Sequence, residues 1–486
     1  MKLIATAQDS GETLYEQISQ HISRLIEQGT LRPGERVPSV RRLSQQQNVS
    51  IATVMQAYRL LESRGFLEAR PQSGYFVRLR HWRPPAEPEI SKPRPVPATI
   101  KTGALMMRVM EAIRDPSLVR FGAALPSPEL LPTEKLNRTL AAASRRNPEL
   151  SNSFDPPPGN TALRNQIARR AIDTGCELSP DDIMTTFGGQ EALHVCLRAV
   201  AKPGDTIAIE SPTYFGILQV IESLGMKALE IPTHPRDGVS LEALAYALEQ
   251  QPVKACLFVL NYNNPLGSCM PDENKRQLVE MLAAKEIPLI EDDIYGDLSH
   301  AQERPRTAKS YDQKGLVLLC DSFSKTLAPG YRVGWTAPGR FKEQVAYYKL
   351  VSTVATASLP QMAIADFLAN GGYGHHLRKV RREYAHKVQL FTEAICKYFP
   401  EETKVTRPTG GHVLWLELPA QVKAVELFEL ALGEKISIAP GPVFSAWQRF
   451  DNFIRLNCAN PWTPALENAL LRLGRLVGRL QEAGSK

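Results

Sequence analysis

A single lysine, Lys325, lies between two serines and shortly before an arginine in one polar stretch of the chain. The stretch follows an apolar run, residues 315–320, that has the length and composition of a buried strand. Burial at the end of a strand lowers the ammonium pKa of a lysine, so that its neutral amine can attack an aldehyde. The neighbouring Ser322, Ser324 and Arg332 could hold a phosphate. An amine nucleophile beside a phosphate site fits pyridoxal phosphate, whose aldehyde forms a Schiff base with a lysine.

Strand-like segments upstream each run into a polar turn, and most of these turns lead into a helical pattern. The segments are residues 182–186, 206–210, 254–260 and 288–291. This alternation predicts a largely parallel sheet flanked by helices, which binds ligands beyond the carboxyl ends of its strands. After the first segment, Gly189 and Gln190 lie where a helix begins. The backbone there can approach a phosphate closely, and the helix N-terminus offers it free N–H groups.

The next turns carry an aromatic ring, an amide and a carboxylate in that order. Tyr214 could lie flat on a pyridine ring, and Asn264 could donate to a ring oxygen together with Tyr295. Asp292 could pair with the pyridine nitrogen and keep it protonated, which makes the ring an electron sink. Each residue alone has a commoner structural explanation, such as a packing tyrosine or an ordinary turn. Their order at consecutive strand ends favours the cofactor site.

Residues from about 117 to 479 resemble the fold-type I pyridoxal-phosphate-dependent aminotransferases. The resemblance implies an internal aldimine at Lys325, Asp292 on the pyridine nitrogen, Asn264 and Tyr295 on the ring oxygen, and Tyr214 stacked on the ring. It also implies a smaller C-terminal α+β subdomain. The phosphate ligands that it implies are Gly189, Gln190, Ser322, Ser324 and Arg332. Within residues 453–457, Arg455 resembles the arginine that binds a substrate carboxylate through two parallel hydrogen bonds.

The net charge of +7 is concentrated near the N-terminus, where residues 21–80 contain ten arginines, no lysine and four acidic residues. Apolar spacing over residues 13–28 predicts a first helix. Ser39 is the expected N-cap of a second helix, and Ser50 lies in the turn before a third. Two strand-like pieces follow, so three helices and a hairpin predict a winged helix-turn-helix. The alternative for the arginines alone is a solvated helix face.

This N-terminal part resembles the GntR family of bacterial DNA-binding domains over nearly all of residues 11–78. The motifs are Leu31-x-Pro33-Gly34-x-x-x-Pro38-Ser39-x-Arg41-x-Leu43 and Ser50-x-x-Thr53-Val54-x-x-Ala57-Tyr58-x-x-Leu61. The resemblance implies a recognition helix over residues 50–64 and a wing around Gly74. The expected DNA contacts are Ser39, Arg41, Arg42, Ser50, Thr53, Gln56, Arg59 and Gly74. Ile51 stands where family members often carry an arginine, which leaves contact with a thymine methyl as the alternative to arginine readout there.

Six prolines between residues 84 and 97 predict an extended, semi-rigid linker that keeps the DNA-binding head apart from the body. We therefore divide the chain into a DNA-binding domain (11–78), a linker (79–117) and a cofactor-binding domain (118–484). No apolar run has the length of a bilayer span, and the N-terminus does not resemble a signal peptide. Seven scattered cysteines without a Cys-x-x-Cys pair argue against disulfides and a zinc site. We expect a cytoplasmic protein without a metal.

A GntR-like head, a proline-rich linker and an aminotransferase-like body together resemble the MocR subfamily of bacterial transcription regulators. The resemblance implies a homodimer that binds operator DNA through two heads and senses an amine, an amino acid or pyridoxal phosphate itself through an external aldimine. The alternative is a working amino acid aminotransferase that carries a DNA-binding head, with Lys325 as the base for half-transamination. A third interpretation is a structural body without cofactor.

Overall fold

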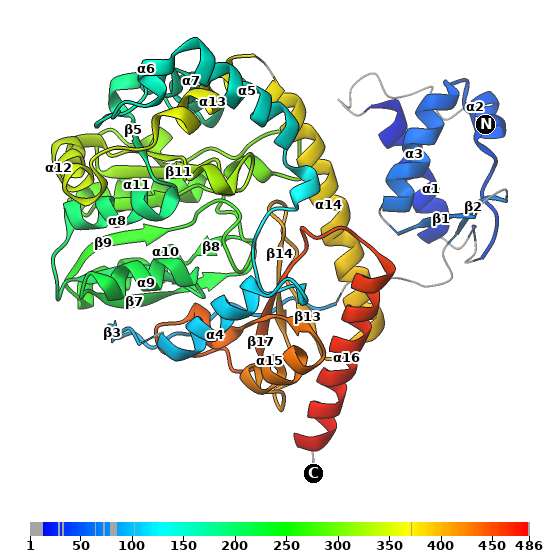
Figure 1. Cartoon of the computed structure of the whole chain (residues 1–486). Coiled ribbons are helices and arrows are strands. Elements are labelled where there is room, and N and C mark those ends of the chain that lie inside the picture. Colours follow the sequence, from blue (N-terminus) through cyan, green and yellow to red (C-terminus); the bar gives the residue numbers. More distant parts are fainter. Residues whose placement is uncertain are drawn as a thin grey trace. The chain divides into compact units, whose positions relative to one another are not determined.

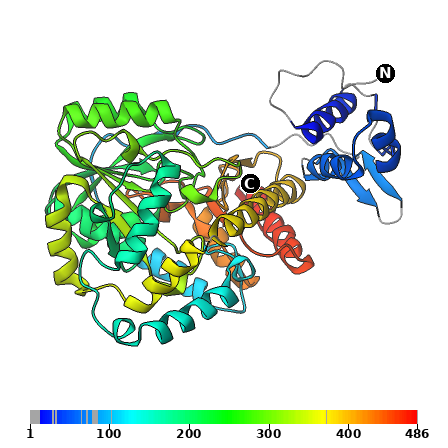
Figure 2. The same cartoon turned by 90° about the horizontal axis from the view of Figure 1, so that it is seen from above.

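The computed structural model describes residues 13–27, 30–31, 34–63, 65–70, 73–77, 85–101, 103–370 and 372–484. The chain forms two compact units, Met1–Pro84 and Pro85–Lys486, which we call the head and the body (Figures 1 and 2). Some predicted features lie outside the described residues. These are residues 11, 12 and 78 of the DNA-binding domain, residue 28 of its first helix, Pro33 of its motif, Arg64 of the recognition helix, and residues 79–84 and 102 of the linker.

The head is a winged helix-turn-helix, as the sequence predicts. Its elements are α1 (Leu14–Glu27), α2 (Val40–Gln47), α3 (Ile51–Ser63), β1 (Leu67–Arg70) and β2 (Gly74–Val77). β1 and β2 pair antiparallel as the hairpin of the wing. Val54, Tyr58 and Leu61 of α3 are fully buried against apolar residues of α1 and α2. The opposite face of α3 is therefore free to carry polar side chains outward.

The body is built on a large mixed sheet in which most strands are parallel (Figure 1). In the described residues, its strands in spatial order are β3 (Ala98–Thr99), β7 (Lys227–His234), β6 (Thr206–Ser211), β9 (Val253–Phe258), β10 (Leu289–Asp292), β11 (Val317–Ser322), β12 (Gly334–Ala337) and β5 (Met184–Thr186). The central strands β7, β6, β9, β10 and β11 run parallel. β3 at one edge and β12 near the other run antiparallel to them, whereas β5, which pairs antiparallel with β12, runs in the same direction as the central strands. The sequence-based prediction of a mostly parallel sheet is confirmed.

Helices bury both faces of this sheet, because alternate residues of each strand belong to different hydrophobic cores. Ile207 and Ile209 of β6 pack with α8 (Gly189–Val200) and α9 (Phe215–Ser223). Ala208 belongs to the core on the other face, with α10 (Leu241–Gln250) and α11 (Asp272–Ala284). A third core joins residues of α5 (Thr133–Arg146), α7 (Thr161–Ala171) and α13 (Ser358–Ala369) to β11 and β12. The strand ends are thereby left as the place for polar chemistry.

A smaller α+β subdomain forms the C-terminal part of the body, as predicted. Its antiparallel strands in spatial order are β13 (Lys404–Val405), β14 (Val413–Glu417), β17 (Phe453–Asn457) and β16 (Ala439–Pro440). Helices α4 (Gly103–Arg114), α15 (Ala424–Gly433) and α16 (Pro464–Gly484) share its core, and so does the second half of the long helix α14 (Gly372–Tyr398). No helix in the described part of the chain is both long and apolar enough to cross a membrane.

The proline-rich segment differs from the expected free linker, because residues 85–101 lie along the body. β3 pairs with the edge strand β7, where a segment with few N–H donors is tolerated. The Ser91 side chain accepts a hydrogen bond from the Thr233 N–H at 2.9 Å, and the Arg94 guanidinium lies 5.0 Å from the centre of the Trp447 ring. The prolines exclude a regular helix or an inner strand here, but they permit a docked, extended segment. Part of the predicted linker beyond it forms α4.

Candidate cofactor site in the body

A cavity with about 120 Å³ of water-accessible space lies where the parallel strands end. Its lining residues are Gly189, Gln190, Leu193, Tyr214, Val259, Asn264, Asp292, Ile294, Tyr295, Ser324, Lys325 and Arg332. Nine of the ten cofactor residues expected from the sequence are among them. The tenth, Ser322, lies directly behind the wall, where its hydroxyl accepts a hydrogen bond from the Ser324 N–H at 3.3 Å. The structure therefore brings the expected set together in one concave site.

Lys325 is the candidate nucleophile of the cavity. Its ammonium donates to the carbonyl of Ala124 at 2.6 Å and lies 5.5 Å from the centre of the Tyr295 ring. Burial, followed by the positive charge of Arg455, lowers the pKa of Lys325 to about 8, although Asp292 acts in the opposite direction. Roughly a tenth of the amine is then neutral at pH 7. This fraction is sufficient for attack on an aldehyde.

Asp292 ends β10 and is 5% exposed. Burial raises the pKa of this carboxyl to about 7, and the charge of Asp293 adds to the effect, whereas a hydrogen bond from the Ile294 N–H and the charge of Lys325 reduce it. A cation placed next to Asp292 would lower its pKa again. The site therefore favours a positively charged partner such as a protonated ring nitrogen.

A chain of hydrogen bonds links Tyr295 to the predicted carboxylate-binding arginine. The Asn264 amide donates to the Tyr295 hydroxyl at 3.2 Å, and its oxygen accepts from Arg455 at 3.1 Å. Arg455 also donates to the carbonyl of Gly122, while its buried Nε has no hydrogen-bond partner among the described residues. Burial lowers the pKa of this guanidinium to about 10. A buried guanidinium with an unused N–H has capacity for an anion.

The opposite end of the cavity suits a phosphate. α8 begins at Gly189, so its first N–H groups point out of the helix at this end. Gly188 before it has φ +81°, and a Cβ there would lie 2.4 Å from a guanidinium nitrogen of Arg332. Arg332 donates to the carbonyl of Pro329 at 3.3 Å and makes no ion pair with a described residue. Its charge therefore remains available to an anion.

Three groups beside this site were not among the residues predicted from the sequence: Gly188, the carbonyl of Ala124, and His412. His412 is fully buried, and its Nδ1 lies 3.0 Å from the Asn457 side-chain oxygen. Burial, with the charge of Lys325 nearby, lowers the pKa of His412 to about 3, so the ring is neutral. The pair of glycines at the start of α8, Gly188 and Gly189, was a usable signal for Gly188. The other two groups come from distant segments, and no local pattern indicates them.

The predicted DNA-contact residues of the head lie on α2, α3 and the wing. Arg41, Arg42, Gln56 and Arg59 are exposed, and the arginines among them make no ion pair with a described residue. The hydroxyls of Ser39 and Ser50 accept hydrogen bonds from backbone N–H groups of Arg42 at 3.3 Å and Thr53 at 3.0 Å. Gly74 starts β2 with φ +96°. Ile51 is 50% exposed at the start of α3. Their contacts with DNA remain predictions.

Known proteins match both units of the chain. Residues 129–473 match the aminotransferase class I and II family, and residues 14–77 match the gntR family of bacterial regulatory proteins. The chain is 41% identical over 470 residues to the uncharacterized HTH-type transcriptional regulator YjiR of Escherichia coli, which covers 97% of this chain and 100% of YjiR. The chain belongs to the MocR type of GntR-family transcriptional regulators. The resemblances predicted from the sequence, a GntR-type head and an aminotransferase-like body in a MocR-type regulator, are thereby confirmed.

The body of this MocR-type regulator is also similar to enzymes. It is 28% identical over 374 residues to the 2-aminoadipate transaminase of Thermus thermophilus, which covers 76% of this chain and 92% of the enzyme. Among solved structures it is similar to the α-aminoadipate aminotransferase LysN of Thermus thermophilus, complexed with N-(5'-phosphopyridoxyl)-L-leucine, with 27% identity and a TM-score of 0.73. That comparison covers 79% of this chain and 97% of LysN. The aminotransferase family is pyridoxal-phosphate-dependent, and the donor set of the cavity fits the phosphate, ring and aldehyde of this cofactor.

Proposed function

We propose that this DNA-binding regulator holds pyridoxal phosphate as a Schiff base with Lys325 and responds to an amine or amino acid, or to the cofactor itself, in the same cavity. The observation that carries the proposal is a set of charged groups in one cavity with no ion pairs among described residues: Asp292, Lys325 and Arg332, with Arg455 beside them. Keeping such charges buried and separate is unfavourable unless a ligand compensates them.

Each residue has a defined role in this proposal. Lys325 supplies the neutral amine that joins the aldehyde carbon with loss of water, and an incoming effector amine displaces it there as a free amine. Asp292 holds a proton on the ring nitrogen, which makes the bound cofactor electron-withdrawing. Asn264 and Tyr295 donate towards the ring oxygen, and Tyr214 stacks on the ring. The phosphate is held by Gly189, Gln190, Ser322, Ser324 and Arg332, and Arg455 binds a carboxylate of the effector.

The head of the proposed regulator binds operator DNA, and a homodimer would present two heads to two half-sites. Arg41, Arg42 and the wing at Gly74 would hold phosphates, while Thr53, Gln56 and Arg59 on α3 would face the major groove. The effector would regulate transcription by binding one arrangement of the domains more tightly than another. We infer that the protein acts in the cytoplasm, where its DNA target lies.

The test uses the cofactor-loaded, full-length protein and a matched pair of lysine variants. Lys325→Ala should remove the visible absorption band of the Schiff base. Lys387→Ala should keep it, although Lys387 also has a pKa lowered by burial and donates to a carbonyl, that of Ala459, at 2.8 Å. Borohydride should fix the cofactor to a peptide containing residue 325. A band that survives Lys325→Ala, or a label elsewhere, would overturn the proposal.

A second candidate function is amino acid transamination. Lys325 with a pKa near 8 could carry the proton between the two carbon positions of an amino acid bound to the cofactor. Steady conversion of an amino acid and a keto acid would favour the enzyme. A change in the spectrum without turnover, together with a change in DNA affinity, would favour the sensor.

A further inference from the structure

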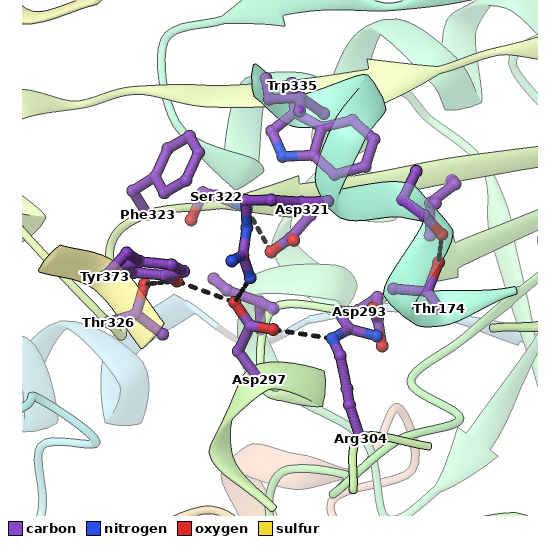
Figure 3. Close-up of a pocket in the computed structure, with 15 residues that line it drawn as sticks. Thr174, Asp293, Asp297, Arg304, Asp321, Ser322, Phe323, Thr326, Trp335 and Tyr373 are labelled. Carbon is purple, nitrogen blue, oxygen red and sulfur yellow. Dashed lines mark hydrogen bonds and ion pairs between the residues drawn. The ribbon is translucent and has the colours of Figure 1, made fainter. Parts of the chain in front are cut away.

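A second, smaller cavity, with about 30 Å³ of water-accessible space, shares a wall with the cofactor cavity. Figure 3 shows the residues that line it. Asp292 and Lys325 line the cofactor cavity, whereas the residues that follow them, Asp293 and Thr326, line the second one. Ile294 lines both cavities. The two chemically important positions of the cofactor site are therefore anchored by their chain neighbours on the far side of a shared wall.

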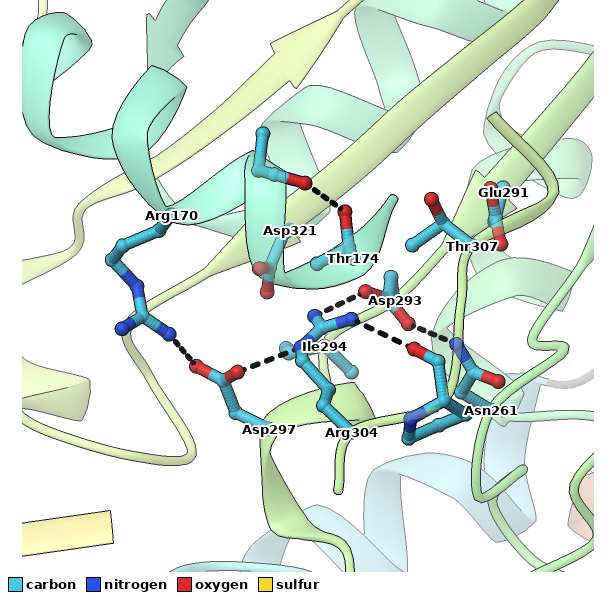
Figure 4. Close-up of polar contacts among 12 residues, drawn as sticks. Arg170, Thr174, Asn261, Glu291, Asp293, Ile294, Asp297, Arg304, Thr307 and Asp321 are labelled. Atoms are coloured by element: carbon cyan, nitrogen blue, oxygen red, sulfur yellow. Dashed lines mark hydrogen bonds and ion pairs between the residues drawn. The ribbon is translucent and has the colours of Figure 1, made fainter. Parts of the chain in front are cut away.

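An ionic network in the second cavity links Asp293 to Asp297 (Figure 4), and a tyrosine continues the path to Thr326. Arg304 bridges Asp293 and Asp297, with its Nε 2.7 Å from an Asp297 oxygen. Arg170 lies 2.7 Å from the other oxygen of Asp297. The Tyr373 hydroxyl lies 2.8 Å from Asp297 and 2.9 Å from the Thr326 hydroxyl (Figure 3). The path from Asp293 to Thr326 is thus continuous.

The hydrogen bonds at the end of this path have a definite direction. Burial alone would raise the pKa of Asp297, but Arg170 and Arg304 outweigh it and hold the pKa below its usual range. Burial and the Asp297 charge raise the pKa of Tyr373, so this hydroxyl keeps its single proton. The proton goes to the carboxylate, which is the stronger acceptor. The Thr326 hydroxyl must then donate to the Tyr373 oxygen.

Helix α14 holds Thr326 from two sides. Tyr373 bonds its hydroxyl, and the Nε2 of His376 lies 2.6 Å from its carbonyl oxygen. Both residues belong to the first turns of α14, which contact the segment that carries Lys325 (residues 323–328), here called the lysine loop. The second half of the same helix packs in the core of the C-terminal subdomain through Val388, Phe391 and Ile395. α14 is therefore one continuous helix that contacts both the segment after Lys325 and that subdomain (Figure 1).

We propose that Tyr373 is a positioning residue that couples the state of Lys325 to α14, and through this helix to the C-terminal subdomain. A change at Lys325 shifts Thr326, and Tyr373 and His376 pass the shift to the helix. The same bonds hold Lys325 in the buried position that depresses its pKa. The inference rests on the proposed function, because it takes the Schiff base at Lys325 as the signal.

Tyr373→Phe tests the coupling, with Tyr331→Phe as its control. Tyr331 also lies close to the lysine loop, and its buried hydroxyl has no partner among the described residues. The first readout is the rate of Schiff-base formation with pyridoxal phosphate as a function of pH. Without the hydrogen bond to Thr326, Lys325 should move to a less buried position, which raises the pKa of its amine. The pH midpoint of the rate should therefore rise by about 0.5 unit, and the rate at pH 7 should fall about threefold. The control should leave both unchanged.

The second readout is amide hydrogen exchange along α14. In the unaltered protein, pyridoxal phosphate should slow exchange at residues 376–382 and 388–398, whereas in Tyr373→Phe the effect on residues 388–398 should disappear. Thr326→Val removes the same bond with little change of shape and should reproduce both results if Tyr373→Phe folds poorly. An unchanged pH midpoint with unchanged coupling to residues 388–398 would overturn the proposal.

Failure of the proposed function would give a different result from failure of the proposed role of Tyr373. If the unaltered protein formed no Schiff base at all, the sensing proposal would fail first. Exchange in the cofactor-free protein would still test the contact, since Tyr373→Phe should speed exchange at residues 376–382 about tenfold relative to Tyr331→Phe, as expected when one hydrogen bond to a charged group is lost. Equal exchange in the two variants would show that Tyr373 does not hold α14 to the loop.

Discussion

The two cavities of the body share a wall, yet they treat buried charge in opposite ways. In the second cavity, Arg170 and Arg304 pair with Asp293 and Asp297. Asp321 also lines this cavity, and burial together with the neighbouring aspartates raises its pKa, which favours its neutral form. In the cofactor cavity, by contrast, no described residue forms an ion pair with the lining groups Asp292, Lys325 and Arg332 or with the adjacent Arg455. The paired charges of Arg170, Arg304, Asp293 and Asp297, which we call the brace, have a structural role. The unpaired charges of the cofactor cavity remain available to bind a ligand.

The pKa shifts follow the same division. In the brace, the pKa of Asp297 is lowered, because its ionised form is the stabilised one. In the cofactor cavity, the pKa values of Lys325, Asp292 and Arg455 all move towards the neutral form. Burial of these unpaired charges therefore reduces the free energy of unfolding. A ligand with phosphate, ring nitrogen and carboxylate groups would pair with them and offset this loss. Substitutions of these residues should have different effects in the two cavities.

The largest effect is expected when the brace loses its central carboxylate. Asp297→Asn leaves the buried Arg304 and the half-buried Arg170 without a full counter-charge and should lower the free energy of unfolding by about 3–5 kcal/mol. Chemical denaturation of the cofactor-free protein measures it. Asp181→Asn is the control, because Asp181 pairs with Arg164 at 3.2 Å but its side chain is 82% exposed, so a loss within about 0.5 kcal/mol is expected. A loss below about 1 kcal/mol for Asp297→Asn would show that the brace is not needed for stability.

The cofactor cavity could be predicted from sequence for a topological reason. Gly189, Tyr214, Asn264, Asp292 and Lys325 each follow a strand-like segment, and the ends of neighbouring strands meet at one edge of the sheet. Residues that follow successive strands in the sequence therefore lie close together in the structure. The head could be predicted because its apolar spacing, caps and turns agree with one another.

The brace could not be predicted in this way. Arg170 lies near the end of α7, Asp297 lies after β10, and Tyr373 begins α14. These positions share no spacing or motif, and their contact depends on how α7 and α14 pack around the sheet. The docked segment 85–101 was misjudged for a related reason: prolines report what the backbone cannot form, but they do not report the surface on which an extended segment lies.

Removing the nucleophile should stabilise the cofactor-free protein. The pKa of Lys325 is about 8 when folded and about 10.4 in an unfolded chain. Between these values the unfolded chain binds more protons, so stability rises with pH across this window. Below pH 8 the whole cost of up to about 3 kcal/mol is present, and Lys325→Met should remove it. Urea unfolding at pH 7, 9 and 10.5 should show the advantage of the variant shrink as pH rises. A constant difference between variant and unaltered protein would contradict the buried-charge account.

Arg455→Met should weaken an effector that carries a carboxylate without disturbing one that lacks it. Loss of a charged hydrogen-bond pair is worth about 2 kcal/mol, or roughly 30-fold in affinity. Spectral titration of the cofactor-loaded protein with an amino acid and with the corresponding decarboxylated amine separates the two. Arg472→Met is the control, because Arg472 pairs with Glu434 outside the cavity and should leave both affinities unchanged. Equal weakening of both ligands would place Arg455 in a structural role.

The head repeats the contrast on its surface, where the smallest effect is expected. Arg70 pairs with Glu68 at 2.6 Å and lies over Phe76, whereas Arg41 and Arg42 make no ion pair with a described residue. If both contact phosphates, Arg41→Gln and Arg42→Gln should each reduce the slope of log affinity against log salt by about 0.9. Operator binding by the full-length protein between 50 and 200 mM salt, the range over which such slopes are usually compared, measures this change. Arg70→Gln should leave the slope unchanged. A slope altered only by Arg70→Gln would mean that the paired arginine contacts DNA, and the association of unpaired charge with binding would then fail in the head.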